Sequence, residues 1–294
     1  MRRARAAVAG LGGVLLLGPL LSWLCAAGEG LAAAAAPAGG EASGTPSNVR
    51  ADQVSVDSRG ATLLATGHVS VMYGALRVTS DSLRLNRSDG TAVFQGHVAA
   101  TDPAGRALGD TITLFATRDG RVVRALLAGH ASVETPSYAV IADRIDADRA
   151  RDRITADAHV TLFSQPDVIV TGTRATYDQR SGDAVILGSA SAPATVQNRD
   201  GRIAGARVDF SRNDMRAVIR GPVTADLFDA KLTGAGATID LRRGIAVFAG
   251  GAVVSRRQGM LEADEITVFY RDRRFIAEGR THLTYRDSEG SPSP

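Results

Sequence analysis

The sequence contains one cysteine and one tryptophan, and only 5% of its residues are aromatic. Cys25 and Trp23 both lie in an apolar segment near the N-terminus, so the rest of the chain has neither a disulfide framework nor a thiolate metal site. Lys231 is the only lysine, and no basic run with interleaved aromatic residues is present. We therefore expect no nucleic acid partner.

Catalytic motifs are also missing from the sequence. No glycine-rich phosphate loop opens a helical segment, and no Gly-x-Ser-x-Gly motif occurs. The sequence therefore predicts a protein that is not an enzyme and that needs no cofactor.

The N-terminal part differs from the rest of the chain in composition. Three arginines, Arg2, Arg3 and Arg5, precede an uncharged apolar stretch that runs to Ala27. Residues 1–27 are interpreted as a signal peptide or an N-terminal membrane anchor, and both alternatives stay open. An Ala/Gly/Pro-rich linker is expected at 28–47, a repeat domain at 48–287 and a disordered tail at 288–294.

A small residue, usually glycine, recurs every 28 to 33 residues in the middle of strand-like segments. These anchors are Gly67, Gly96, Gly129, Ala158, Gly188, Gly221, Gly251 and Gly279. A fixed period of this kind indicates a repeat architecture. Glycine inside a strand usually marks a bend, a bulge or the close approach of another backbone.

Apolar residues alternate with polar ones on both sides of each anchor, which is typical of a strand with one buried face. Asp-Gly and Ser-Gly turns separate these strands and predict hairpins. About eight bent hairpins give roughly 16 strands, which would fold over into two facing layers. We predict an all-β fold, an elongated antiparallel β-jelly roll built from repeats of roughly 30 residues. A right-handed parallel β-helix is the structural alternative.

Histidines and aspartates recur at fixed places in the repeat. His68, His97, His130 and His159 each follow an anchor directly. Equivalent strands of successive hairpins lie roughly 9–10 Å apart, too far to share one zinc ion, so we expect no metal site. The aspartates that recur between anchors, Asp81, Asp110, Asp143 and Asp264, are interpreted as bend-stabilising groups that accept from nearby backbone N–H groups.

The inward row of the strands has two interpretations: a closed core, or a groove that accepts acyl chains. Many of its positions are small, which is compatible with either alternative. The groove candidates are Val69, Val71, Phe94, Val98, Leu127, Val133, Ile154, Val160, Leu162, Ile186, Ile219, Val223, Val247, Val253 and Leu283.

Several segments resemble the repeat of the OstA-like family of lipopolysaccharide transport proteins, which includes LptA, LptC and the N-terminal domain of LptD. They are ATGHVSV from Ala65, FQGHVAAT from Phe94 and LAGHASVET from Leu127. The resemblance covers nearly all of 49–285. With eight repeat units the chain is longer than a minimal family member, so 48–287 is expected to be an elongated or a tandem jelly roll. It implies a periplasmic β-jelly roll whose interior holds the acyl chains of lipopolysaccharide and whose end strands pair with neighbouring jelly rolls.

The expected function is therefore a non-enzymatic periplasmic carrier or bridge of the LptA type in lipopolysaccharide transport. One alternative is an inner-membrane-anchored component of the LptC type. Another is a structural or adhesive β-rod of the envelope with a closed core. The expected partners are lipopolysaccharide, other jelly-roll transport proteins and further copies of the chain, joined head to tail.

Overall fold

A computed structural model describes residues 46–57, 59, 61–73, 76–103, 105–117, 122–136, 138–164, 168–257, 259–270 and 272–285. These residues form twenty β-strands and contain no helix. The predicted leader and linker up to residue 45 and the predicted tail at 288–294 lie outside the described residues. Among the described residues, no helix is long and apolar enough to cross a bilayer.

The chain divides into two compact units. The described part of the N-terminal unit comprises 46–164 and 174–182, and that of the C-terminal unit comprises 168–173 and 183–285. Strand β10 (Val168–Asp178) contributes residues to both units.

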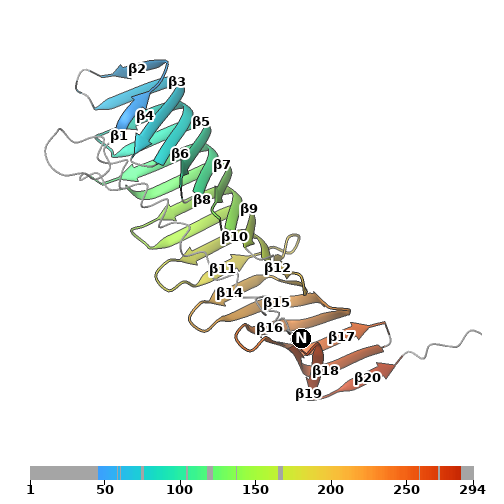
Figure 1. Ribbon diagram of the computed structural model, residues 1–294. Helices are drawn as coiled ribbons and strands as arrows, with labels where there is room; N and C mark the ends of the chain where they lie inside the picture. Colours follow the sequence, from blue (N-terminus) through green and yellow to red (C-terminus); the bar gives the residue numbers. More distant parts are fainter. Residues whose placement is uncertain are drawn as a thin grey trace, which may run out of the picture. The chain divides into compact units, whose positions relative to one another are not determined.

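The N-terminal unit is a succession of antiparallel hairpins (Figure 1). Its other strands are β1 (Pro46–Arg50), β2 (Gln53–Val56), β3 (Thr62–Tyr73), β4 (Leu76–Asn86), β5 (Thr91–Asp102), β6 (Gly105–Ala116), β7 (Val122–Glu134), β8 (Tyr138–Asp148) and β9 (Arg153–Ser164). Each strand from β3 to β9 pairs with the next one along the chain between these bounds. β1 and β2 pair with the two halves of β3.

The C-terminal unit repeats this pattern with more interruptions. Its strands are β11 (Ala184–Leu187), β12 (Ala194–Asn198), β13 (Gly201–Gly205), β14 (Arg207–Ser211), β15 (Arg216–Leu227), β16 (Ala230–Asp240), β17 (Ile245–Arg256), β18 (Gly259–Phe269), β19 (Arg274–Glu278) and β20 (His282–Tyr285). β13 and β14 pair with the two halves of β15, and β19 and β20 pair with the two halves of β18. β11 and β12 pair with β14 and β13, so they too correspond to one long strand. With β1 and β2, four long strands are thus each split into two short ones, which reconciles the twenty observed strands with the roughly 16 expected.

The bends that the glycines predicted are β-bulges. In β3 the pairing with β4 shifts between Thr66 and Val69, so that Gly67 and His68 form the bulge. Both residues have positive φ, 77° and 47° respectively. A Cβ on Gly67 would lie 2.2 Å from the Asp52 carboxylate, so only glycine fits against that side chain. Because the bulge holds two residues, the inward row keeps its phase on either side of it.

Alternation along the strands places the apolar side chains in the interior. The largest fully buried side chains include Phe94, Leu127 and Ile145 in the N-terminal unit and Ile219, Leu232 and Phe248 in the C-terminal unit. The predicted fold class, an all-β antiparallel jelly roll of bent hairpins, is confirmed.

The predicted register is wrong by one residue at the seventh anchor. The pairing of β17 with β18 shifts between Ala249 and Ala252, and the residue equivalent to the other anchors is Gly250 rather than Gly251. A Cβ on Gly250 would lie 2.6 Å from the Ala235 Cβ, whereas one on Gly251 would meet nothing within 4 Å. This register turns the large side chain of Phe248 fully inward, where burial stabilises it most.

Candidate functional site

The inward row is closed along most of each unit. Eleven of the groove candidates are at most 8% exposed: Val69, Val71, Phe94, Val98, Leu127, Val133, Val160, Leu162, Ile186, Ile219 and Val223. Ile154, near the start of β9, is half-buried. These side chains contact one another rather than solvent, so an acyl chain can reach them only where the interior opens.

Two candidates do not lie on the inward row. Val247 and Val253 are half-buried, whereas their neighbours Phe248 and Val254 are buried. The prediction that both valines lie on the inward row is wrong, because the bulge begins at Gly250, one residue earlier than predicted. Two successive glycines, Gly250 and Gly251, made the anchor ambiguous in the sequence.

The interior of the N-terminal unit opens at its first strands. Val54 of β2 pairs with Ala65, and Val56 pairs with Leu63. Directly paired residues share a face of the sheet, so both valines belong to the inward row. Ala65 is fully buried, yet Val54 and Val56 are 52% and 54% exposed. We call this pair of valines the N-terminal mouth.

The C-terminal unit opens in the same way at its last strands. Val254 pairs with Leu261, which pairs in turn with Leu283 of β20. Val254 is 4% exposed, Leu261 is half-buried, and Leu283 is 62% exposed. Exposure therefore rises along the row toward the edge of the sheet. We call Leu261, Leu283 and the neighbouring Tyr285 the C-terminal mouth.

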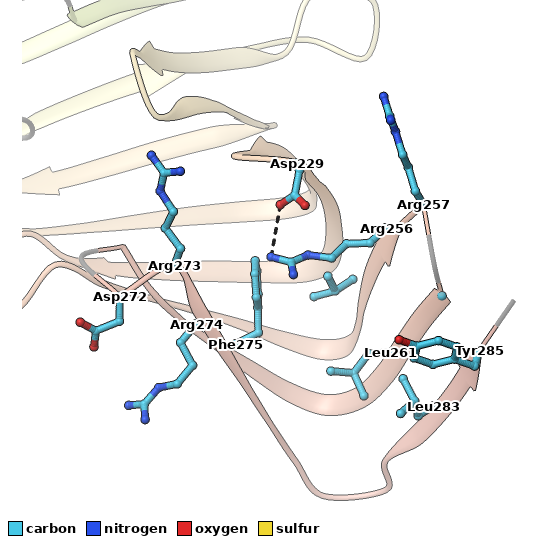
Figure 2. A pocket seen from close by; sticks show the side chains of 12 residues that line it. Asp229, Arg256, Arg257, Leu261, Asp272, Arg273, Arg274, Phe275, Leu283 and Tyr285 are labelled. Carbon is cyan, nitrogen blue, oxygen red and sulfur yellow. Dashed lines mark ion pairs between the residues drawn. The ribbon is translucent and has the colours of Figure 1, made fainter. Parts of the chain in front are cut away.

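A cavity of about 870 Å³ lies at the C-terminal mouth (Figure 2). Apolar residues line one part of it: Val254, Leu261, Phe275, Leu283 and Tyr285. Gly259 and six charged residues line the remainder; the charged residues are Arg256, Arg257, Arg273, Arg274, Asp229 and Asp272. Its volume lies in the range of small-molecule sites, and the cavity combines an apolar wall with a charged rim.

The histidines and aspartates of the bulges form a row of exposed pairs. The Nδ1 atoms of His68, His97, His130 and His159 lie 2.9, 2.9, 3.1 and 3.0 Å from carboxylate oxygens of Asp52, Asp81, Asp110 and Asp143. The four histidine side chains are 86–94% exposed. The hydrogen bond and the charge of the paired carboxylate raise the pKa of His68 and of His97. No group of three or more potential metal ligands gathers in the described part of the chain.

The sequence itself contains a signal of this pairing: the two partner positions change together from repeat to repeat. That signal was not used in the predictions above. In one repeat Ala206 stands in place of the aspartate, and Pro222 stands in place of the histidine. In another, Ala235 stands in place of the aspartate and Gly251 in place of the histidine. The last bulge keeps Asp264 and places Arg280 beside it, with guanidinium Nη2 2.9 Å from Oδ1. Partner residues therefore change together from repeat to repeat.

Among the recurring aspartates, Asp264 has the predicted bond to the backbone, whereas Asp81, Asp110 and Asp143 pair with histidine side chains. Its Oδ2 accepts a hydrogen bond of 3.0 Å from the backbone N–H of Arg280 in the bulge. The side-chain hydrogen bonds and then the backbone hydrogen bond from Arg280 lower the pKa of Asp264. The carboxylate is thus held ionised beneath a turn whose glycine, Gly279, has φ 87°.

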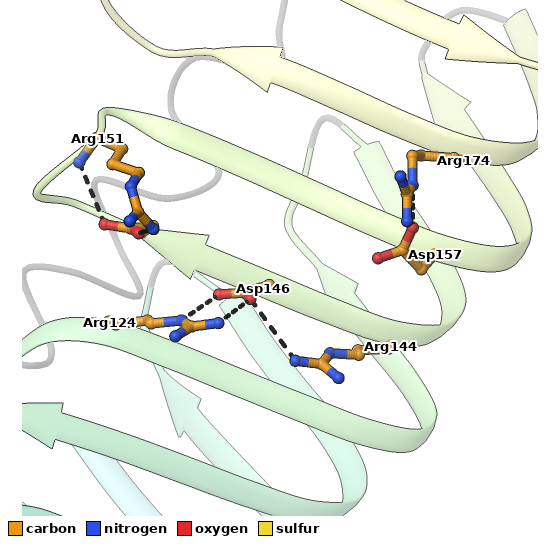
Figure 3. A network of polar contacts seen from close by, with 7 residues as sticks. Arg124, Arg144, Asp146, Arg151, Asp157 and Arg174 are labelled. Carbon is orange, nitrogen blue, oxygen red and sulfur yellow. Dashed lines mark hydrogen bonds and ion pairs between the residues drawn. The ribbon is translucent and has the colours of Figure 1, made fainter.

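A second polar network covers the outward face of the N-terminal unit (Figure 3). Arg124 of β7 donates two hydrogen bonds to Asp146 of β8, from Nε at 2.8 Å and from Nη2 at 2.5 Å. Arg144 lies 3.8 Å from the same carboxylate, and Arg174 pairs with Asp157. These bonds link adjacent strands across the face opposite the inward row, and we assign them to sheet stability.

Comparison with known proteins identifies the family. The family described as "LptA/(LptD N-terminal domain) LPS transport protein" matches residues 48–216, more than half of the chain. The chain belongs to this family. The matched segment covers the described strands of the N-terminal unit and reaches the start of β15 in the C-terminal unit. The predicted membership in the OstA-like lipopolysaccharide (LPS) transport family is therefore confirmed.

Solved structures give a more distant likeness. LptH, the LptA homologous periplasmic component of the LPS transport device from Pseudomonas aeruginosa, is 20% identical, with a TM-score of 0.34. The alignment covers 39% of this chain and 82% of LptH. No curated protein matches the sequence.

Proposed function

We propose that this chain is a non-enzymatic periplasmic carrier of the LptA type, which binds the acyl chains of LPS in its apolar interior. The observation that carries the proposal is the rise in exposure of the inward row at the mouths, where Leu283 is 62% and Val54 52% exposed. An inward apolar row that reaches solvent offers a surface to a lipid tail. Burial of each methylene group there would contribute about 0.8 kcal/mol.

The composition of the inward row favours entry of an acyl chain beyond the mouths. Many inward side chains are alanine, including Ala65, Ala92, Ala125, Ala156 and Ala217. Alanine buries little area, so separating the layers at these positions exposes less apolar surface than separating rows of leucine. We propose that acyl chains enter at a mouth and contact inward residues such as Val98 and Ile219 as the layers separate.

The end strands supply the second part of the proposal. β2 and β20 are short strands whose side chains are exposed throughout. The unpaired edge of a terminal strand is a template for an added strand. We propose that these edges pair with other jelly-roll transport proteins or with a second copy of the chain, so that LPS passes from one interior to the next.

A structural β-rod is the second candidate, because the interior is closed along most of each unit. Phe94, Leu127 and Phe248 are fully buried, as expected for a permanent core. In a rod, the mouths would serve only for end-to-end assembly. Binding of LPS by the isolated chain separates the two candidates.

Native mass spectrometry of the purified full chain with LPS, and with LPS whose acyl chains have been removed, provides the test. A carrier binds intact LPS and loses about a hundredfold or more in affinity for the deacylated form. Leu283→Asp should weaken binding of intact LPS. Ile141→Asp is the matched control. Ile141 is 46% exposed and faces outward, whereas its chain neighbours Val140 and Ala142 are buried. Absence of binding, or equal binding of both forms, would exclude the carrier.

A further inference from the structure

The cavity at the C-terminal mouth carries an excess of positive charge. Four arginines and two aspartates line it, so the lining carries two more positive than negative charges. The arginines come as two adjacent pairs: Arg256 and Arg257 at the end of β17, and Arg273 and Arg274 at the start of β19. All four are exposed. They lie beyond residue 216, where the match to the family ends.

Aromatic rings rather than carboxylates hold most of these guanidinium groups. Arg256 lies over the Phe275 ring at 4.7 Å, Arg274 over Phe269 at 4.6 Å, and Arg273 over Phe228 at 5.3 Å. A ring attracts a guanidinium without neutralising its charge, so N–H groups that do not contact the ring can still donate. Such a group is positioned for a planar or tetrahedral anion without being neutralised.

Among the described residues, carboxylates engage only one of the four arginines. Arg256 Nη2 lies 3.3 Å from Asp229 Oδ1, and both side chains are well exposed, at 40% and 75% (Figure 2). An exposed ion pair of this kind contributes little to stability, so Arg256 can leave Asp229 and bind an anion that interacts more strongly. In the part of the chain that the structure describes, Arg257, Arg273 and Arg274 form no ion pair with a carboxylate.

The arginine pair of the neighbouring turn behaves differently. Arg242 donates from Nη2 to the Asn213 carbonyl at 2.8 Å, and Arg243 lies 3.7 Å from Asp240. A backbone carbonyl thus engages Arg242, whereas the ion pair of Arg243 is as exposed as that of Arg256. The pairs at the cavity are distinguished by the apolar wall beside them.

We propose that this cavity binds the phosphorylated end of the lipid, with the arginines donating to lipid-borne phosphate and Leu261, Leu283 and Tyr285 contacting the first part of an acyl chain. Arginine recognises phosphate through paired N–H donors, and the apolar wall adjoins the charged rim as the acyl chains of an anionic lipid adjoin its head group. This inference rests on the proposed function, because it takes LPS as the ligand and names its phosphates as the recognised group.

The test compares two triple variants of the full chain in equilibrium binding to LPS and to enzymatically dephosphorylated LPS. Arg257→Gln/Arg273→Gln/Arg274→Gln removes three cavity arginines and keeps Arg256 with Asp229. Arg77→Gln/Arg84→Gln/Arg87→Gln removes three exposed arginines of the N-terminal unit and so makes the same change in net charge. Circular dichroism and the thermal midpoint confirm that both variants are folded.

The cavity variant should bind intact LPS about tenfold or more weakly, because it loses charge-assisted hydrogen bonds, and the control should stay within about twofold. Wild type should bind dephosphorylated LPS as weakly as the cavity variant binds intact LPS. Dephosphorylation should cause no further loss of affinity in the cavity variant. An equal loss in both triple variants, or additive losses from variant and dephosphorylation, would overturn the inference.

Two further results separate the inference from the function on which it rests. If wild type binds LPS and the cavity variant binds it equally well, the phosphate site is wrong and the carrier stands. If wild type does not bind LPS, the carrier itself is wrong. Excess inorganic phosphate should not displace LPS fully, because the site uses acyl contacts as well; full displacement would show that free phosphate is the ligand.

Discussion

At the scale of single residues, backbone conformation and space both select glycine at the first bulge. Gly67 has φ 77°, and a Cβ there would lie 2.2 Å from the Asp52 carboxylate. Gly251 has a similar φ of 75°, but a Cβ there would meet nothing within 4 Å. The two positions therefore separate the conformational cost of a side chain from its steric cost.

Gly67→Ala should lower the free energy of unfolding more than Gly251→Ala does. At Gly251 the cost is the left-handed conformation alone, about 1–2 kcal/mol. At Gly67 the displacement of Asp52 and the disturbance of its bond to His68 add to that cost. Urea unfolding of both variants measures the difference. An equal or larger loss at Gly251 would contradict the steric argument.

The pairs formed by His68 and His97 should make stability depend on pH. The pKa of His97 is raised above its ordinary value of 6.5, mainly by the hydrogen bond to Asp81. The folded state thus binds the proton more tightly than the unfolded state, so this stabilisation is complete below about pH 6.5 and is lost as pH rises through the folded-state pKa. The chain should therefore resist urea better near pH 6 than near pH 8.5.

His97→Ala should reduce this dependence on pH and leave the fold intact, because the side chain is 93% exposed. NMR titration of His97 in wild type and in Asp81→Asn gives the direct reading. The pKa should fall toward the ordinary value when the carboxylate is lost. A wild-type pKa at or below 6.5 would show that the pair does not form in solution.

At the scale of elements, the register of β17 is decided by one large side chain. Phe248 is fully buried and Val247 is half-buried. Phe248→Ala should cost about 3–5 kcal/mol, the usual effect of emptying an aromatic site in a core, and Val247→Ala about 1 kcal/mol or less. Thermal unfolding of the two variants compares them. The reverse order would restore the register that the sequence suggested.

The sequence predicted the hairpins because alternation, turn residues and repeated glycines all pointed to the same strands. It could not decide between Gly250 and Gly251, since either glycine tolerates positive φ and only the packing of Phe248 selects one. It also predicted an ordinary repeat strand through Gly188, whereas a loop at 188–193 separates β11 from β12.

The candidate site was predictable only in part. The inward row followed from the alternation, and most of its members are buried as expected. The pairing of histidine with aspartate depends on which residues face each other across two strands, a spacing of 16 or 20 residues that differs between repeats. The arginine-lined cavity joins turns separated along the chain, so no local pattern indicated it.

At the scale of the whole molecule, the exposed end strands should make the chain associate with itself. Val54→Lys/Val56→Lys places charges on the N-terminal edge and should weaken association, since lysine on an edge strand opposes strand addition. Ile141→Lys is the control on the outward face. Sedimentation velocity over a range of concentrations measures the effect. A chain that stays monomeric at every concentration would contradict pairing through its own ends.

The most direct test of the carrier is photocrosslinking of the folded full chain to LPS, with a probe placed in turn at Leu283, Val98 and His97. Leu283 lies at the C-terminal mouth, Val98 is a buried inward residue, and His97 points outward beside it. The account predicts crosslinks at Leu283 and Val98 and none at His97. No crosslink at either inward position, or equal crosslinking at His97, would contradict an acyl-binding interior.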